Sequence, residues 1–212
     1  MSVYIVNEPE KRMITDLERF VGPYAPEAPY ALIVDALRDS YRAFTKRTYV
    51  IRREIEIDVY EGVRNYSVNV GDDLILTRVL ECYYGDDECK LKPSSSRIPK
   101  GDYRLYYMPN PYSISIGIVP TEDKERFLKL QITCASTEKN MSIDEQVYQE
   151  WGPVIGKGAA AYLLGIPGHP FSNEMAARRL QIDFERGVRD ANVIMDKARH
   201  GAPLTMRAPR YV

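Results

Sequence analysis

Three regimes of hydrophobic patterning follow one another along this chain: a helical one, an alternating one and a second helical one. Over residues 30–48, apolar side chains recur every three or four positions while basic side chains occupy the remaining surface. This spacing predicts an amphipathic helix. Its apolar face is formed by Ile33, Leu37, Tyr41 and Phe44.

A shorter helix is predicted ahead of it, over residues 9–20, where apolar side chains again gather on one side. The prolines that follow stand three positions apart, which excludes a regular helix up to residue 29. The apolar side comprises Met13, Ile14, Leu17 and Phe20, and the prolines are Pro23, Pro26 and Pro29.

The middle of the chain, residues 49–134, consists of short runs in which apolar and polar side chains alternate, separated by Gly, Asp, Asn and Pro. Alternation with a period of two between turn residues predicts a small antiparallel sheet or sandwich. Within it, residues 90–100 have the sequence KLKPSSSRIPK, which predicts an exposed loop suited to contact with a partner.

Helical periodicity returns after residue 136. Ser142 and Glu145 match a capping box at the start of a helix that ends at the Gly and Pro residues of 165–170. A last helix is predicted from a cap at Ser172 to about Arg199, with a length of about 42 Å. It carries an apolar stripe that requires a helical partner in this chain or in another copy. The stripe comprises Ala177, Leu180, Phe184, Val188, Ala191 and Met195.

These patterns predict an α+β protein in which N-terminal and C-terminal helices form a bundle and an antiparallel β domain is inserted between them. The expected boundaries are 1–48 and 137–200 for the discontinuous helical domain, 49–136 for the β-sheet or sandwich domain, and 201–212 for an extended C-terminal arm. The arm has no acidic residue and too much Gly and Pro for regular structure. It is either a binding arm that orders on a partner or a plain frayed terminus.

Charge and composition narrow the function classes. Lys and Arg number 29 against 30 Asp and Glu, a formal net charge of −1, which disfavours a protein that coats DNA. We find no apolar run long enough to span a membrane and no signal-peptide pattern at the N-terminus, so we expect neither a membrane anchor nor export. Three cysteines are too few for a disulfide framework and indicate a reducing cytoplasm.

The motifs that could carry chemistry favour structural interpretations. The letters of a dinucleotide fingerprint occur at 156–161, but inside a predicted helix rather than after a strand, so small residues there indicate close helix packing. The acidic run 86–88 near Cys82 and Cys89 lacks the spacing of a calcium or zinc site and is interpreted as a turn. His169 and His200 have no nucleophile in a recognisable setting. We therefore expect no catalytic residue, no metal and no cofactor.

Aromatic usage leaves two interpretations open. Tyr occurs 16 times and Phe only 5 times. Tyrosine suits both the positions of a sheet in a monomer and a surface that is buried against a partner, because its ring is apolar while its hydroxyl stays paired or hydrated.

The order of motifs along residues 28–212 resembles the head-to-tail adaptor family of tailed phages, also called tail tubular protein A in short-tailed phages. An early helix carries the D-A-L…F pattern, and the C-terminal half carries a Trp, Gly-Ala, Leu-Leu, a Pro-x-x-Pro turn, paired alanines and F-x-x-G-x-x-x-A. The matching residues are Asp35, Ala36, Leu37, Phe44, Trp151, Gly158, Ala159, Leu163, Leu164, Pro167, Pro170, Ala176, Ala177, Phe184, Gly187 and Ala191.

This resemblance implies a non-enzymatic virion protein at the head–tail junction, present in the host cytoplasm during assembly. Such adaptors form a homo-oligomeric ring of about twelve copies that joins the portal protein to a tail tube, nozzle or stopper protein, while double-stranded DNA passes through the lumen without sequence-specific binding. A near-neutral charge suits such a conduit, since a strongly positive wall would retain phosphates.

Three sets of residues are the expected contacts under this interpretation. A portal-docking arm comprises Arg207, Pro209, Arg210 and Tyr211; subunit contacts comprise Arg178, Arg179, Arg186 and Arg189; and a tail-contact loop comprises Lys92, Ser94, Ser95, Ser96 and Arg97. The four helical arginines equally suit a solvated helix face. The alternative from another class is a monomeric β-domain binding module for a peptide or glycan.

Overall fold

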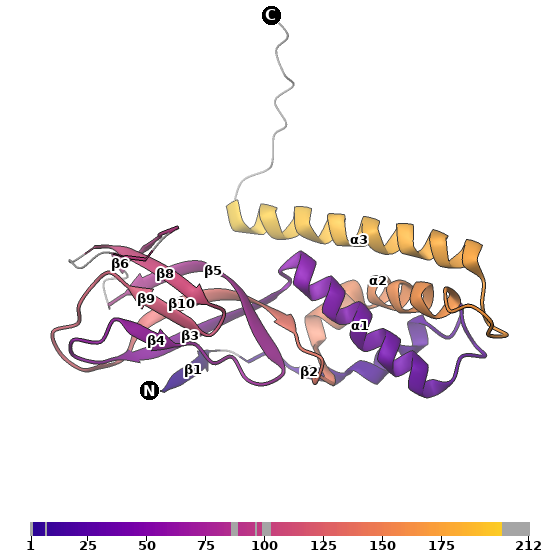
Figure 1. Cartoon of the computed structure of the whole chain (residues 1–212), viewed down its shortest axis with the longest axis horizontal. Coiled ribbons are helices and arrows are strands. Elements are labelled where there is room, and N and C mark those ends of the chain that lie inside the picture. Colours follow the sequence, from indigo (N-terminus) through magenta and orange to yellow (C-terminus); the bar gives the residue numbers. More distant parts are fainter. Residues whose placement is uncertain (1, 7, 86–88, 96, 99–102, 201–212) are drawn as a thin grey trace, which may run out of the picture.

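The computed structural model describes residues 2–6, 8–85, 89–95, 97–98 and 103–200, with side chains up to residue 197. It shows a mixed α+β protein in which helices from the two ends of the chain pack together and the strands form mainly antiparallel sheets. Helices gather at one end of an elongated molecule and the two larger sheets at the other (Figure 1). The predicted fold class is confirmed.

The helical end is built around its second long helix. That helix, α2, packs against the 3₁₀ helix η1, against α1 and against α3. Figure 1 shows α3 lying along the outside of this group. The bounds are η1 Ile14–Phe20, α1 Tyr30–Thr48, α2 Glu145–Leu164 and α3 Glu174–His200.

The strands form three sheets in the described part of the chain. The largest is antiparallel, in the order β1 Val3–Val6, β3 Ile51–Val59, β10 Lys124–Ser136, β5 Leu74–Tyr84 and β6 Cys89–Lys90. The second has the order β4 Asn65–Ser67, β9 Ser113–Ile116, β8 Leu105–Asn110 and β7 Lys92–Pro93, and only its β7–β8 pair is parallel. A short pair, β2 Lys11–Met13 and β11 Ser142–Asp144, lies beside the helices.

One hydrophobic core runs through both ends of the molecule. Alternate residues of β3 and β10 are buried as the sequence pattern predicts, since successive side chains of a strand point to opposite faces. Where the sheet meets the helices, Arg53 of β3 donates to both carboxylate oxygens of Asp144, at 2.7 and 2.9 Å, and both residues are buried. This ion pair ties the large sheet to the start of α2.

Several of the residues that carry the adaptor resemblance meet in the helical core, whereas Asp35, Pro167 and Pro170 are exposed. Phe44 of α1 lies with its ring centroid 5.7 Å from that of Trp151 and 6.3 Å from that of Phe184. A Cβ at Gly158 would lie 2.7 Å from Phe184 Cδ2, and one at Gly187 would lie 2.4 Å from Val154 Cγ1. The small residues of α2 and α3 therefore allow close helix approach, as the sequence predicts, and the motifs describe packing rather than a binding site.

Several local predictions are wrong. The helix predicted over 9–20 is a strand followed by a 3₁₀ helix, because β2 pairs with β11 and the Ile14 amide donates to the Met141 carbonyl. Ser142 lies in β11 and its hydroxyl bonds to Asn140, so it forms no capping box. Asn173, not Ser172, caps α3, since its Oδ1 accepts from the Ala176 amide at 3.0 Å.

The described residues of the segment 90–100 do not form the exposed loop that the sequence predicts. They include the end of β6 and the whole of β7, and Leu91 and Ile98 are buried. In the β5–β6 pair, the register places Cys89 opposite Tyr84 rather than opposite Cys82. The acidic run 86–88 lies outside the described residues.

Candidate interaction surfaces

Helix α3 has two faces of different chemistry. The predicted stripe is buried from Ala177 to Ala191 against the rest of the helical end, while Met195 is half-buried. On the opposite side, Met175, Ile182 and Val193 are 84%, 58% and 46% exposed. A contiguous apolar patch that faces solvent marks an interaction surface, whereas single exposed apolar residues are common on monomers. The predicted stripe thus has its partner inside the chain, whereas no partner of the outer line occurs among the described residues.

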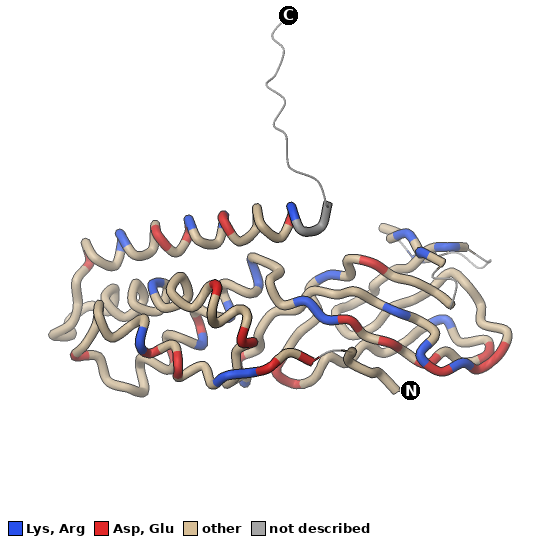
Figure 2. Tube along the Cα trace, turned by 180° about the vertical axis from the view of Figure 1, so that it is seen from behind, with Lys and Arg blue, Asp and Glu red and all other residues tan. Residues whose placement is uncertain are grey.

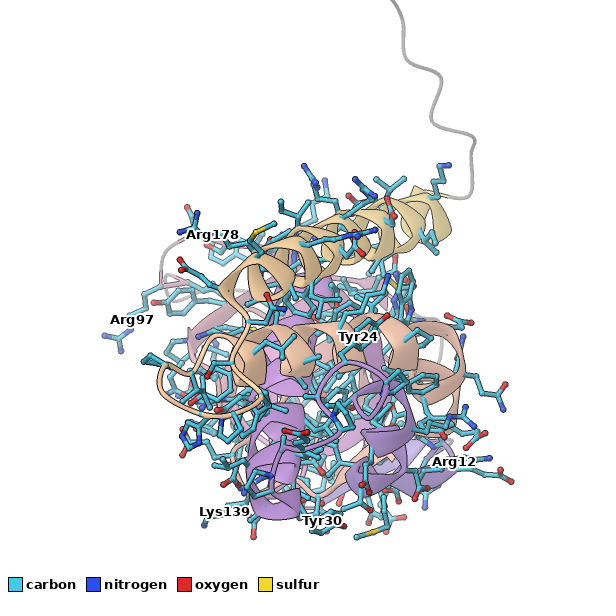
Figure 3. The ribbon with its side chains drawn as sticks, turned by 90° about the vertical axis from the view of Figure 1, so that its right-hand side faces the viewer. Arg12, Tyr24, Tyr30, Arg97, Lys139 and Arg178 are labelled. Atoms are coloured by element: carbon cyan, nitrogen blue, oxygen red, sulfur yellow. The ribbon has the colours of Figure 1, made fainter. Side chains whose placement is uncertain are left out.

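The four predicted subunit-contact arginines all lie on this exposed side. On a helix of 3.6 residues per turn, Arg178 and Arg189 flank the apolar line on one side, and Arg179 and Arg186 flank it on the other. Arg178 lies on the side of the helical end away from Tyr30 (Figure 3). Lys and Arg positions recur along α3 among acidic ones (Figure 2). We call the surface formed by Met175, Ile182, Val193 and these four arginines the outer α3 face.

Two of the four arginines form ion pairs with acidic residues of α3 itself. Arg178 pairs with Glu174 at 2.6 Å and Arg186 with Asp183 at 3.8 Å, and the arginine of each pair is exposed. Exposed pairs contribute only about 0–1 kcal/mol, so these arginines stay available to a partner at small cost. On the flank of the helix, Arg47 donates to Glu185 and lowers the pKa of its carboxyl, an effect to which the charge of Arg189 adds.

A groove of about 860 Å³ opens at the β end of the molecule. One side is the edge of β5 from Thr77 to Glu81, and the other is formed by residues 90–95 with part of β8. The predicted tail-contact residues Lys92, Ser94 and Ser95 line it. The structure thus brings these three together and adds residues of β5 that sequence analysis did not single out.

Most charged groups at the groove are cationic. Arg52, Arg78, Lys90 and Lys92 line it with a single acid, Glu81. The Lys90 ammonium lies 2.5 Å from the Glu81 carboxylate, and the Tyr83 hydroxyl donates to the same carboxylate, which raises the pKa of both Lys90 and Tyr83. Within the described part of the chain, no ion pair or hydrogen bond involves the side chain of Arg78 or Lys92. These two cations are therefore open to an anionic group.

The remaining predicted contact residues are only partly described. Arg97 is exposed and projects away from the body of the molecule (Figure 3), whereas Ser96 lies outside the described residues. Arg207, Pro209, Arg210 and Tyr211 also lie outside them. The end of α3, which precedes the arm, is attached to the large sheet, because Arg52 of β3 donates to the Met195 carbonyl of α3 at 2.9 Å.

Tyrosines occupy both kinds of position that the sequence left open. Tyr41, Tyr66, Tyr106 and Tyr148 are buried, whereas Tyr30, Tyr112 and Tyr162 are more than half exposed. Tyr148 is covered by two guanidinium groups, with Arg12 4.7 Å and Arg19 4.9 Å from its ring centroid. Tyrosine in this chain is therefore partly a core residue and partly a surface one.

No cluster of three potential metal ligands occurs among the described residues. Cys82 and Cys134 are buried free thiols, and burial raises the pKa of Cys134 to about 12, so it stays protonated at neutral pH. Among the described helices, none combines the length and apolar character needed to cross a bilayer.

Neither the groove nor the outer α3 apolar line was predicted as a site. The groove forms between β5 and β8, which are separated in sequence and belong to different sheets, so no local pattern marks it. The outer α3 line did leave a signal: Met175, Ile182 and Val193 repeat at 7 and 11 residues, on the side of the helix opposite the predicted stripe.

No protein-family model matches this chain, and no curated protein matches it. Among solved structures, it is similar to a chain from the neck of an empty GTA particle, computed with C6 symmetry. The sequences are 14% identical, and the match covers 85% of this chain and 95% of that chain with a TM-score of 0.29. A likeness at that TM-score does not support a shared role, so we infer the role of this chain from its own residues.

Proposed function

We propose that this chain is a structural virion protein of the head–tail junction, an adaptor that forms a ring between the portal and the tail. The resemblance of residues 28–212 to head-to-tail adaptors supports this function. The α+β architecture agrees with the one that the resemblance implies, and three residues of the resemblance, Phe44, Trp151 and Phe184, pack together in its helical core. No enzymatic step is part of the proposal.

The chemistry of the outer α3 face is the observation that supports ring formation. A helix that already buries one apolar stripe has no need of a second apolar line for its own fold, and this line is framed by four arginines. Subunit interfaces combine a desolvated apolar centre with arginine at its margin. We assign Arg178, Arg179, Arg186 and Arg189 to contacts between neighbouring copies.

The contacts with the tail and with the portal are assigned to different parts of the chain. We propose that residues 1–48 and 137–200 form one helical domain, residues 49–136 a β domain and residues 201–212 an extended arm. Lys92, Ser94, Ser95, Ser96 and Arg97 of the β domain contact the tail component, and Arg207, Pro209, Arg210 and Tyr211 of the arm dock to the portal. About twelve copies surround a lumen through which double-stranded DNA passes.

Native mass measurement of the chain co-expressed with the portal candidate encoded near it tests this function. Addition of about twelve copies to a portal ring supports the adaptor. A persistent monomer beside an intact portal contradicts it and favours the monomeric binding module, for which the groove at β5 is the specific observation.

A charge-reversal pair tests the ring surface separately. Arg179→Glu with Arg186→Glu should reduce ring formation about tenfold or more, since like charge at an interface costs several kcal/mol. Lys46→Glu with Lys139→Glu, at exposed positions outside the outer α3 face, is the matched control and should assemble normally. Normal assembly of both variants would remove the outer α3 face from the ring.

A further inference from the structure

The groove at the β end lies between two strand edges that lack backbone partners. From Leu74 to Glu81, β5 pairs only with β10 within the described part of the chain, because β6 reaches no further than Tyr83 and Tyr84. On the facing side, β7 pairs with β8 only at Leu105 and Tyr106. The chain crosses from one sheet to the other through Leu91, and no described strand pairs with this part of the β5 edge.

The groove has the floor that an added strand needs. Val79, Leu91 and Met108 supply apolar groups, and the Tyr106 hydroxyl contacts the Val79 carbonyl at 3.5 Å, beneath the gap. Five residues of β5 line the groove, a length of about 17 Å at about 3.4 Å per residue. An extended peptide that pairs with such an edge gains affinity from main-chain hydrogen bonds and specificity from alternate side chains.

The charges around the edge restrict what can enter. Arg78 on β5 and Lys92 on β7 have no ion pair among the described residues, and Lys and Arg positions gather where β6 lies at this end of the molecule (Figure 2). Cations at an exposed edge repel the same edge of another copy, which is a common protection against aggregation. The same cations attract an acidic strand.

We propose that this groove receives an extended acidic segment of a tail-side protein, which adds a strand beside β5. Alternate side chains of the segment contact Val79, Leu91 and Met108, and its carboxylates face Arg78 and Lys92. The proposal rests on the tail contact of Lys92, Ser94 and Ser95 for the source of the strand. The arm of a second copy does not fit, since residues 201–212 have two arginines and no acid.

Amide chemical shifts of the isolated ¹⁵N-labelled chain test the groove without the ring. The probe is the peptide acetyl-Glu-Val-Glu-Val-Glu-Val-Glu-amide, titrated to about 5 mM so that weak binding is detected. Shifts should concentrate at residues 77–81 and 92–95, and the amides of the β5 edge should exchange more slowly with solvent. The matched peptide with Lys in place of Glu should produce no such shifts.

Variants of the chain and of the peptide distinguish the contribution of charge to binding from that of backbone pairing. Arg78→Glu should weaken the acidic peptide about tenfold, whereas Lys139→Glu, with the same charge change on an exposed residue outside the groove, should leave binding unchanged. A proline at the central peptide position should also weaken binding, because it removes a backbone donor.

Three results would overturn the proposal. No shift at the highest acidic-peptide concentration would show that the edge accepts no strand, and equal shifts with the Lys peptide would show that the cations do not select. Stronger shifts of the same amides by a short DNA duplex would assign the groove to nucleic acid. The peptide titration uses the isolated chain and ring assembly is measured separately. A failure of ring assembly would therefore not change the interpretation of the peptide titration.

Discussion

At the scale of single residues, the Arg53–Asp144 pair joins the two ends of the molecule. Its side chains are 4% and 10% exposed, and the guanidinium also donates to the Arg52 carbonyl at 2.8 Å. Tyr41 is buried close enough for the charges of both partners to act on its phenol, whose pKa burial raises. A buried pair with two hydrogen bonds fixes orientation more than it adds stability.

Removing one partner of this pair should be costly. Asp144→Ala leaves the Arg53 charge buried without a counter-ion, and we expect the free energy of unfolding to fall by about 3–5 kcal/mol. Denaturant unfolding measures it, with Asp190→Ala at an exposed position as the control. A double replacement, Arg53→Met with Asp144→Leu, should recover most of the loss. A change below about 0.5 kcal/mol in Asp144→Ala would show that the pair is not desolvated in solution.

Buried thiols should make the fold sensitive to alkaline pH. Burial raises the pKa of Cys134 to about 12 and also raises that of Cys82, whereas both thiols ionise near about 8.5–9 when unfolded. The folded state therefore retains protons that the unfolded state loses. Stability is fully present below about pH 8.5 and falls as pH rises toward about 12, by up to about 1.4 kcal/mol per pH unit for each thiol.

Denaturant unfolding at several pH values measures this slope. In Cys82→Ala with Cys134→Ala, the onset of the loss should move to about pH 10, where unfolded tyrosines begin to ionise. The slope, rather than the absolute stability, is compared, since the alanines also remove packing. Equal slopes for both proteins between about pH 9 and 10 would contradict the assignment to the thiols.

At the scale of elements, the α2–α3 packing depends on glycines that lower helix propensity. Gly187 faces Val154, and Gly158 faces Phe184 and Ser40. The Ser40 hydroxyl donates to the Ile155 carbonyl at 2.6 Å. A glycine inside a helix costs about 1 kcal/mol relative to alanine. The cost is compensated where the missing Cβ lets a neighbouring helix approach.

Gly187→Ala should therefore destabilise the protein despite its better helix propensity. Its Cβ would lie 2.4 Å from Val154 Cγ1. Overpacking costs about 1–3 kcal/mol, so we expect a net loss of about 1–2 kcal/mol in chemical unfolding after the propensity gain. In the background of Val154→Ala the same substitution should become neutral or stabilising. Additive effects in this cycle would mean that the two side chains do not limit the helix approach.

Element prediction succeeded where a local pattern agreed with the packing. The helix over 30–48 has the predicted bounds, since Pro29 precedes it and Tyr49, with φ of 54°, ends it. Residues 11–13 have a helical pattern locally but pair with residues 142–144, a contact that no nearby residue signals. The groove was missed for the same reason, because it forms where β5 lacks a neighbouring strand.

At the scale of the whole molecule, two separate surfaces have no partner among the described residues. The outer α3 face lies on the helical end, and the groove lies at the β end beside residues 90–95. The apolar stripe and the small residues of the helices predicted the helical core, while the contacts proposed for Arg178, Lys92 and the arm involve other molecules and stay predictions. One chain with two unpartnered surfaces suits a component that joins neighbours laterally and a further protein at one end.

The arm supplies the last prediction, because α3 leads into it. Arg52 of β3 donates to the Met195 carbonyl, and the buried apolar stripe of α3 runs from Ala177 to Ala191. A chain that ends at His200 should therefore unfold at the same denaturant concentration as the full chain and still form lateral contacts. It should lose portal binding, measured as co-purification with the portal ring.

A milder change separates length from charge in the arm. Arg207→Ala with Arg210→Ala keeps all 212 residues and should weaken portal binding about tenfold or more, as expected when two cations leave a charged interface. Arg97→Ala, an exposed cation on the β end, is the matched control and should bind the portal normally. If the chain ending at His200 binds the portal as well as the full chain does, the arm is a plain terminus, and portal docking has to be sought on the helical end.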